Sequence, residues 1–434
     1  MIHVLAHGVG GRSDLPLPLW LFMYGAAFAL LISFVALRIL WPRPRLAKAS
    51  TGRAFPAGSA TAVAIVRGCI RVLGLFAFGV VLYAAVGGVD NAGENIAPYA
   101  LYVGFWVGMQ VESALVGDLY ALANPFDTLA LLLRIPARTF RTEDHDPGQW
   151  TAALLLLSFA WLELAYHTPS SPRVIGVWLS VYTVAVLGGA LVWGREWLRY
   201  GEGFAALFAL LGHIAPVGRD DAGHLRIRAP LSALSTLRLR RGTSAVVFLA
   251  LGSTTFDGLS RTKFWADIVN QRTGWSATFV ATIGIVWTIA MVCVAYLIAT
   301  RVVARITDED PNTVATAFIA SLVPIAFAYA VAHYFSLLVF DGQNLIALAS
   351  DPFGRGWDLF GTIDQTVNYR LVSVRTIALV QAGAIVVGHV SGVLVAHDRA
   401  VERYRPNLAV RSQYPLLAVM IAYTVGGLAI LLGG

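Results

Sequence analysis

The feature that most constrains this chain is a series of apolar runs, many of them about 20 residues long, separated by short polar segments. A helix of about 20 apolar residues crosses the hydrocarbon layer of a bilayer. Apolar residues make up 57% of the sequence and charged residues only 13%, so a soluble globular fold is excluded. We therefore expect an all-α, polytopic integral membrane protein.

The apolar runs predict ten transmembrane helices in one transmembrane domain. Residues 1–194 would hold the first five helices, residues 195–242 a basic loop with an interfacial helix, and residues 243–434 the last five. The first run lacks a basic segment before it, which favours a retained helix over a cleaved signal peptide. The predicted spans are Leu17–Leu40, Val66–Gly87, Ala97–Tyr120, Trp150–His167, Val174–Gly194, Thr243–Gly258, Trp275–Thr300, Thr313–Val339, Leu371–Ala396 and Tyr414–Leu432.

Two further apolar segments are too short to cross a bilayer. Phe126–Ile135 and Phe204–Ile214 are each followed by a basic loop. Short apolar helices next to cationic loops are typical of the membrane interface. We expect both to lie along the membrane surface.

Cations gather in alternate loops, and this pattern predicts the topology. One set of loops holds Arg43, Arg45, Lys48, Arg53, Arg134, Arg138, Arg141, the stretch from Arg195 to Arg241, Arg301, Arg305, Arg399, Arg403, Arg405 and Arg411. The other set holds Asp14, Asp90, Glu94, Asp267, Asp351, Asp358 and Asp364. By the positive-inside rule both termini face outward from a bacterial cytoplasmic membrane. The same rule accounts for the net charge of +7 with lipid as the partner and without nucleic acid.

An internal echo is compatible with two five-helix halves of opposite topology. Leu119–Phe126 (LYALANPF) follows the third span, and Leu345–Phe353 (LIALASDPF) follows the eighth. Third and eighth are equivalent positions in a five-plus-five inverted repeat, the arrangement of many secondary transporters. The match requires a gap of one residue and depends on Leu and Ala, which are abundant in this chain.

Ionisable groups inside spans are costly, so each is a functional candidate. Near the predicted outer surface lie Glu163, His167, Asp257, His333 and Asp341. Glu163 and His167 are four residues apart and share one helix face, where they could hold a divalent metal such as Zn²⁺ together with His333. Asp257 or Asp341 would then support the ligands or act as a base. The alternative is a hydrogen-bonded Glu163–His167 pair with His333 as a packing residue.

Two other groups of residues are candidates for ion binding. His3 stands third from the α-amine and His7 follows one turn later, an arrangement of nitrogen ligands that suits Cu²⁺ or Ni²⁺. Toward the predicted inner half, Glu112, Asp118 and His389 could relay protons or bind a coupling cation, or could be a structural polar cluster. Cys69 and Cys293 are far apart in sequence and predict neither a redox pair nor a thiolate metal site.

Four segments resemble a family of bacterial polytopic membrane proteins, some of whose members are labelled fenitrothion hydrolase. They are His7–Trp20 (HGVGGRSDLPLPLW), Ala332–Leu338 (AHYFSLL), the DPFG and WDLFG motifs within residues 351–361, and Leu394–Ala400 (LVAHDRA). The resemblance covers the whole chain. It implies hydrolysis of an organophosphate triester by a membrane-bound enzyme, and it assigns no catalytic residues.

Two functions follow as hypotheses. The first is a metal-dependent hydrolase of apolar phosphotriester-type esters, with an outward-facing site at Glu163, His167 and His333. The second is a secondary transporter, or a membrane subunit, that moves a metal ion, a proton or a small solute through the Glu112–Asp118–His389 group. A subunit that depends on a membrane partner for its activity is a third alternative.

Overall fold

The computed structural model describes residues 18–55, 60–137, 146–219 and 223–433, and these are almost entirely helical. Seven helical segments are long and apolar enough to cross a membrane. They are α1 (Leu19–Leu40), α3 (Ala60–Gly87), α9 (Pro172–Trp193), α13 (Gly274–Thr307), the continuous segment Pro311–Leu348, α16 (Val374–Arg403) and α17 (Pro406–Gly433). The expectation of an all-α, multi-pass membrane protein is confirmed.

Three of the ten predicted spans form shorter or broken helices. Residues 96–116 comprise α4 (Ile96–Tyr99), the π-helix η3 (Ala100–Gly108) and α5 (Met109–Val116). The other two are α8 (Trp150–Leu164) and α11 (Thr243–Ser260). Protein surrounds α11 along most of its length, so it can carry Ser253, Thr254 and Thr255 on buried faces. Their hydroxyls bond to backbone carbonyls of the preceding turn.

The remaining elements are short and connect the long helices. The segment Pro311–Leu348 consists of α14 (Pro311–Phe318), η7 (Ile319–Leu322) and α15 (Val323–Leu348). Other short helices are α2 (Leu46–Ser50), η2 (Ala92–Glu94), α6 (Tyr120–Ala123), α7 (Pro125–Leu132), η5 (Arg195–Arg199), α10 (Gly203–Gly212), η6 (Ser232–Thr236) and α12 (Lys263–Val269). The strands β1 (Arg53–Ala54), β2 (Val217–Arg219) and β3 (Leu225–Ile227) form an antiparallel sheet in the order β1-β3-β2.

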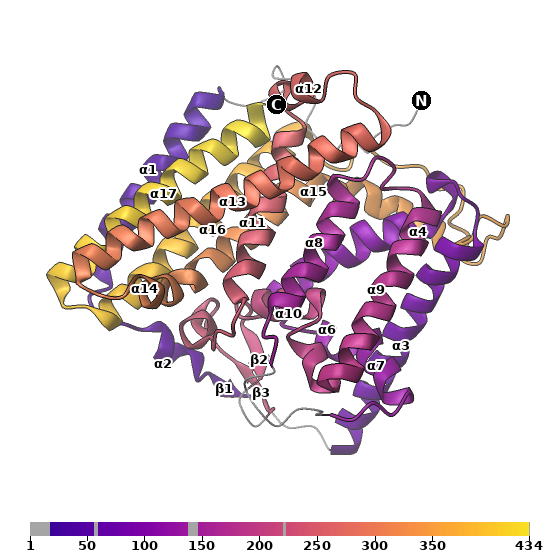
Figure 1. Ribbon diagram of the computed structural model, residues 1–434, viewed down its shortest axis with the longest axis horizontal. Helices are drawn as coiled ribbons and strands as arrows, with labels where there is room; N and C mark the ends of the chain where they lie inside the picture. Colours follow the sequence, from indigo (N-terminus) through magenta and orange to yellow (C-terminus); the bar gives the residue numbers. More distant parts are fainter. Residues whose placement is uncertain (1–17, 56–59, 138–145, 220–222, 434) are drawn as a thin grey trace.

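The long helices form two lobes with a central layer between them (Figure 1). In one lobe α1 packs against α16 and α17, with α13 beside α17. In the other, α3 packs against α9. Helices α8, α10, α11 and α15 lie between the lobes. The first helix of the chain therefore packs against the last two. Helix α10, predicted to lie along the membrane surface, is instead buried inside the bundle.

Close helix packing in the C-terminal lobe depends on small residues. A Cβ at Gly388 of α16 would lie 2.1 Å from Cβ of Ala328 on α15. A Cβ at Gly392 would lie 2.8 Å from the Ser321 carbonyl oxygen. Two glycines four residues apart on one helix face let the backbones approach, as in many membrane bundles.

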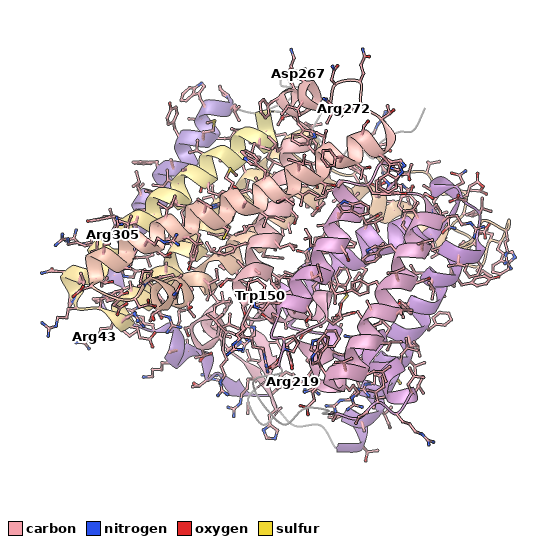
Figure 2. The ribbon with its side chains drawn as sticks, in the orientation of Figure 1. Arg43, Trp150, Arg219, Asp267, Arg272 and Arg305 are labelled. Atoms are coloured by element: carbon pink, nitrogen blue, oxygen red, sulfur yellow. The ribbon has the colours of Figure 1, made fainter. Side chains whose placement is uncertain are left out.

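The loops predicted to share one side of the membrane meet at one end of the bundle. Arg53 pairs with Ile227 in the sheet, which joins the loop after α1 to the long basic loop. Asp398 at the end of α16 accepts hydrogen bonds from Trp41 Nε1 and from the Arg45 backbone, each 2.7 Å long. Figure 2 shows Arg43 and Arg219 toward its lower edge and Asp267 and Arg272 at its upper edge.

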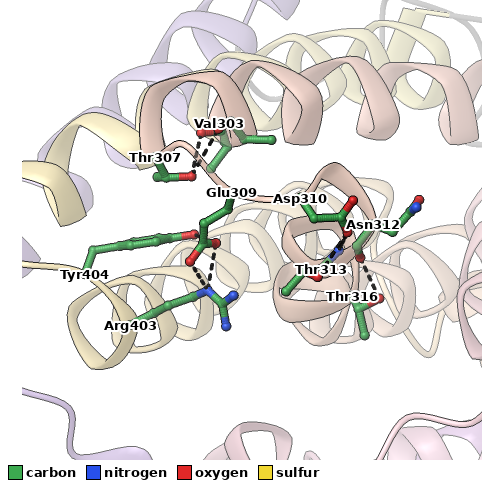
Figure 3. Close-up of polar contacts among 10 residues, drawn as sticks. Val303, Thr307, Glu309, Asp310, Asn312, Thr313, Thr316, Arg403 and Tyr404 are labelled. Carbon is green, nitrogen blue, oxygen red and sulfur yellow. Dashed lines mark hydrogen bonds and ion pairs between the residues drawn. The ribbon is translucent and has the colours of Figure 1, made fainter.

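The turn between α13 and α14 is tied to the turn between α16 and α17 (Figure 3). Glu309 Oε2 lies 3.0 Å from Arg403 Nε and accepts a 2.9 Å hydrogen bond from the Tyr404 hydroxyl. Asp310 caps α14 through a 2.8 Å bond from the Thr313 backbone N–H, and this bond is the main cause of the lowered pKa of Asp310.

At the opposite end the loops with few cations meet in the same way. The Val89 N–H donates to the Phe353 carbonyl at 3.1 Å, and the Ile96 N–H donates to the Pro352 carbonyl at 3.2 Å. Asp90 accepts a 3.1 Å bond from the Ser171 hydroxyl, just before α9. Loops of the cation-rich set therefore contact one another at one end of the bundle, and loops of the cation-poor set contact one another at the other end.

Candidate functional site

The central feature of the site is a buried carboxylate–imidazole pair between α11 and α15. His333 Nε2 lies 2.7 Å from Asp257 Oδ2, and each side chain is only 5% exposed. The ring N–H is not aligned with the carboxylate as a regular hydrogen bond, so the contact is primarily electrostatic. A carboxylate beside an imidazole fixes the orientation of the ring.

A cation one helical turn further along α11 completes the pairing of Asp257. Arg261 approaches Asp257 Oδ1 with Nε at 3.2 Å and a terminal guanidinium nitrogen at 2.9 Å. Arg261 is the C-cap residue of α11, and its side chain is 31% exposed. The guanidinium therefore reaches into the bundle from one end of the helix, and a buried carboxylate requires such compensation.

A second carboxylate, Glu163 on α8, belongs to the same cluster. It interacts electrostatically with Asp257, with Arg261 and with Tyr334 of α15. Two carboxylates thus face one guanidinium and one imidazole. The cluster is electrically neutral when it holds a single proton, either on His333 or on a carboxylate. This charge balance makes the group suitable for taking up and releasing one proton.

The ion pair borders an apolar cavity of about 390 Å³ between α11, α13, α15 and α17. We call it the His333 cavity. It is lined by Thr254, Thr255, Gly258, Met291, Val292, Ala295, Tyr329, Ala332, His333, Val419, Ala422, Tyr423, Gly426, Gly427, Ile430 and Leu431. An apolar cavity with a few convergent polar groups is typical of a small-molecule site.

Hydroxyl groups continue from this cavity toward a second buried histidine. The Thr255 and Tyr423 hydroxyls are 2.6 Å apart, and the Tyr329 hydroxyl donates to the Tyr423 carbonyl at 2.8 Å. The ring of His389 on α16 lies 5.8 Å from that of Tyr329. His389 Nδ1 is 2.9 Å from the Ile385 carbonyl, whereas its buried Nε2 has no hydrogen-bond partner.

The predicted outer residues are therefore brought together only in part. Glu163, Asp257 and His333 meet, but His167 is exposed and its Nδ1 lies 3.2 Å from the Thr278 hydroxyl. The His167 ring packs against Tyr166 and Trp275. Asp341 lies elsewhere on α15, where Asn344 Nδ2 donates to it at 3.3 Å.

The structure does not bring the three predicted metal ligands together as one group. Within the described ranges, no group of three His, Cys, Asp or Glu side chains is placed to hold a metal ion. His333 is engaged by Asp257, and His167 contacts α13 instead of pointing to Glu163 and His333. His3 and His7 lie outside the described residues.

The predicted inner residues Glu112, Asp118 and His389 do not all lie together. Glu112 and Asp118 are electrostatic neighbours at the end of α5, and Asp118 accepts a 3.0 Å bond from the Ala121 N–H. His389 lies instead beside Tyr329 and Tyr423.

Sequence reasoning missed Arg261, Tyr334 and the hydroxyl groups of the His333 cavity. The spacing of Asp257 and Arg261, four residues apart on one helix, was the available signal for the cation. Tyrosines in apolar spans carry no comparable signal, because most of them pack like other aromatic residues.

Comparison with models of protein families, with curated proteins and with solved structures finds no match. The fold and the site geometry define the class of the molecule as an all-α, multi-pass membrane protein with a charged cluster beside an apolar cavity.

Proposed function

We propose that this protein is a membrane-embedded hydrolase of apolar phosphotriester-type esters, with His333 as the general base. The observation that carries the proposal is the buried Asp257–His333 pair on the wall of the 390 Å³ cavity. The resemblance to proteins labelled fenitrothion hydrolase agrees with this chemistry. An apolar aromatic ester dissolves in the bilayer, and a cavity bounded by transmembrane helices suits such a substrate.

The proposed reaction uses the residues as follows. His333 Nδ1, the ring nitrogen not engaged by Asp257, takes a proton from water as the water oxygen attacks phosphorus. The phosphorus–oxygen bond to the aryl group breaks, and the aryl oxide leaves. Asp257 holds the ring and stabilises the imidazolium that forms. Arg261 and Glu163 keep the charge of the cluster balanced as the proton moves.

The proposal places the chain in a bacterial cytoplasmic membrane with ten passes and both termini outside. Seven long segments together with residues 96–116, α8 and α11 would make these passes. The cations at one end of the bundle support this orientation through the positive-inside rule. The Asp257–His333 pair would then lie in the outer half of the membrane.

The test is release of 4-nitrophenolate from diethyl 4-nitrophenyl phosphate by detergent-purified protein. We expect His333→Asn and Asp257→Asn each to lower kcat by about 100-fold or more, as for loss of a general base. His389→Asn is the matched control, since it removes a buried imidazole that is not paired with a carboxylate. Absence of hydrolysis by the wild-type protein would contradict the proposal.

Metal analysis of the same samples tests a separate prediction. A metal bound by Glu163, His167 and His333 would be lost in His167→Ala as well as in His333→Ala. Because His167 lies apart from the cluster, we expect His167→Ala to leave hydrolysis unchanged.

A second candidate function is transport of a small solute coupled to protons. The observations that favour it are the Thr255, Tyr329 and Tyr423 hydroxyls at the His333 cavity, the Tyr329 ring beside His389, and a cluster that balances its charge with one proton. Proteoliposomes containing a pH-sensitive dye would report proton movement, which should be lost in both His333→Asn and His389→Asn. Because His389→Asn should leave hydrolysis unchanged, loss of proton movement in that variant would separate transport from hydrolysis. The inverted repeat stays a prediction of this second candidate.

A further inference from the structure

A second apolar cavity lies in the other lobe, away from the charged cluster. Its volume is about 310 Å³, and α3, η3, α9 and α10 supply most of its wall. We call it the Tyr120 cavity. Seven of its lining residues are aromatic: Phe78, Phe105, Tyr120, Phe126, Trp178, Tyr182 and Phe204. Many of these rings already pack edge to face, such as Phe105 on Phe204 at 4.8 Å and Phe78 on Phe126 at 5.4 Å.

The π-helix η3 shapes one wall of this cavity. Ala100, Gly104, Phe105 and Met109 all line it. Bonding from residue i to i+5 widens each turn beyond four residues, so positions i, i+4, i+5 and i+9 lie on one face. Three of the four residues are small or flexible, and Gly104 is already close to Leu345, because a Cβ there would lie 3.0 Å from Leu345 Cδ2. Single π-turns in helices occur frequently at functional sites.

One polar atom in the cavity wall has no partner. The Tyr120 side chain is 2% exposed, and its buried hydroxyl forms no hydrogen bond. The carboxylate of Glu202 lies beside this hydroxyl and interacts with it electrostatically, but no bond of regular geometry joins them; Glu202 accepts bonds from the Tyr182 hydroxyl, from the Phe204 N–H at 3.0 Å and from the Ala205 N–H at 2.8 Å. A buried hydroxyl without a partner is costly, so the Tyr120 O–H is available to a bound acceptor.

The cavity adjoins the lipid-facing surface of α3. Ala77 lines the cavity and is itself exposed, and its neighbours Leu73 and Phe76 are 64% and 68% exposed. Only 11% of the apolar window of α3 is buried inside the protein. A molecule dissolved in the bilayer can therefore reach the cavity at Ala77 without crossing water.

We propose that the Tyr120 cavity binds a membrane-soluble aromatic molecule with one hydrogen-bond-accepting oxygen, to which the Tyr120 hydroxyl donates. The aromatic lining favours ring packing over a flexible acyl chain. The single orphan donor selects a carbonyl, ether or phosphoryl oxygen. The site carries no base or nucleophile beside its opening, so it binds without reacting, and the proposal does not rest on the hydrolase activity.

Benzophenone is a suitable probe, because it has two rings and one carbonyl and forms covalent bonds to nearby C–H groups under ultraviolet light. We expect saturable labelling of peptides from residues 100–126 in the detergent-solubilised full chain. Diphenylmethane has the same shape without the oxygen and should compete about tenfold less well than unlabelled benzophenone, as expected for loss of one hydrogen bond.

Two variants and one control define the outcome. In Tyr120→Phe, benzophenone and diphenylmethane should compete equally, because the donor is gone. Ala77→Trp should block labelling by filling the opening. Tyr423→Phe, which removes a hydroxyl from the His333 cavity, should change neither result. The Ala77→Trp experiment stands even if Tyr120→Phe fails to fold.

Labelling spread evenly over lipid-facing helices, or unaffected by Ala77→Trp, would overturn the proposal, since it would reflect partition into detergent only. If benzophenone and diphenylmethane competed equally in the wild type, the cavity would accept any apolar occupant, such as an acyl chain. That result would also overturn the proposal.

Discussion

The His333 cavity and the Tyr120 cavity are similar in size and both apolar, with volumes of about 390 and 310 Å³, yet their polar groups differ in kind. The first has a carboxylate paired with an imidazole and a guanidinium. The second has a neutral hydroxyl beside a carboxylate that accepts bonds from a tyrosine and from two backbone N–H groups. The difference teaches that the chemistry of an apolar cavity depends on how its few polar atoms are compensated.

The buried carboxylates of the two regions show the same contrast. Asp257 is compensated by a guanidinium and an imidazole from two helices, whereas Glu202 is compensated by the N-terminal N–H groups of α10 and by a tyrosine. A proton that moves can change the charge of the side chains around Asp257. It cannot change the backbone N–H groups that bond to Glu202. The His333 cavity therefore suits the proposed proton transfer, and the Tyr120 cavity suits the proposed binding.

The largest expected effect comes from neutralising Asp257. Asp257→Asn leaves Arg261 and His333 without their buried counter-charge and should destabilise the protein by about 3 kcal/mol, since breaking a buried pair is strongly unfavourable. Glu202→Gln should cost less, about 1–2 kcal/mol, because the amide keeps one acceptor oxygen for the α10 N–H groups. Thermal unfolding in detergent, followed by tryptophan fluorescence, ranks the two variants.

Adding Arg261→Gln to Asp257→Asn provides the control. The double variant should recover part of the lost stability, because it removes the unbalanced cation along with the anion. A double variant less stable than Asp257→Asn alone would mean that Arg261 stabilises the fold independently of Asp257, and the contrast between the two carboxylates would then fail.

Tyr120→Phe should have the opposite sign. Its hydroxyl is buried without a partner, so removing it should leave stability unchanged or raise it by about 1 kcal/mol. Tyr329→Phe is the matched variant in the other cavity and should cost about 1 kcal/mol, because its hydroxyl donates to the Tyr423 carbonyl. Both are measured as shifts in Tm. Equal losses in the two variants would show that the Tyr120 hydroxyl already has a partner.

A smaller effect is expected at the floor of the Tyr120 cavity. Asn124 caps α7 by accepting bonds from the Phe126 and Asp127 N–H groups at 2.8 and 3.2 Å. Asn124→Ala should cost about 1 kcal/mol, the usual loss for a helix cap. Because Pro125 and Phe126 line the cavity, benzophenone labelling should also weaken. Asn124→Asp keeps the acceptor, so a similar loss in that variant would contradict the capping argument.

The sequence predicts the fold class well, because apolar run length and loop charge depend only on local composition. Seven of the ten predicted spans and the meeting of alternate loops follow from this. The packing of α1 against α16 and α17 does not, since nothing in the Leu17–Leu40 run specifies its neighbours. The length of α10 likewise predicts an interfacial helix, yet α10 is buried. A short apolar helix enters the bundle only where the other helices leave space for it, and the sequence does not specify that space.

The candidate site shows the same limit. Glu163, Asp257 and His333 were placed at one depth from span ends, and they do meet. His167 was assigned to the same face by its spacing, but α8 ends at Leu164, so the i, i+4 relation to Glu163 does not hold there. Helix ends are the least certain feature of a sequence-based prediction. That single uncertainty separates the predicted metal site from the observed ion-pair cluster.

The smallest effect concerns the loop end of the bundle, which neither cavity reaches. The pKa of Asp310 is lowered, chiefly by the hydrogen bond from the Thr313 N–H, and this side chain caps α14. A carboxyl whose pKa is lower in the folded state stabilises the fold at pH values above its unfolded pKa, and this contribution is lost as the pH falls.

Asp310→Asn retains a capping side chain that does not titrate. The Tm of the wild type should therefore fall slightly more than that of Asp310→Asn as the pH is lowered through the acid range, with hydrolysis at neutral pH unchanged. An equal fall in both would show that the cap contributes nothing through its charge, and the acid sensitivity of the protein would then have to be sought at the buried carboxylates.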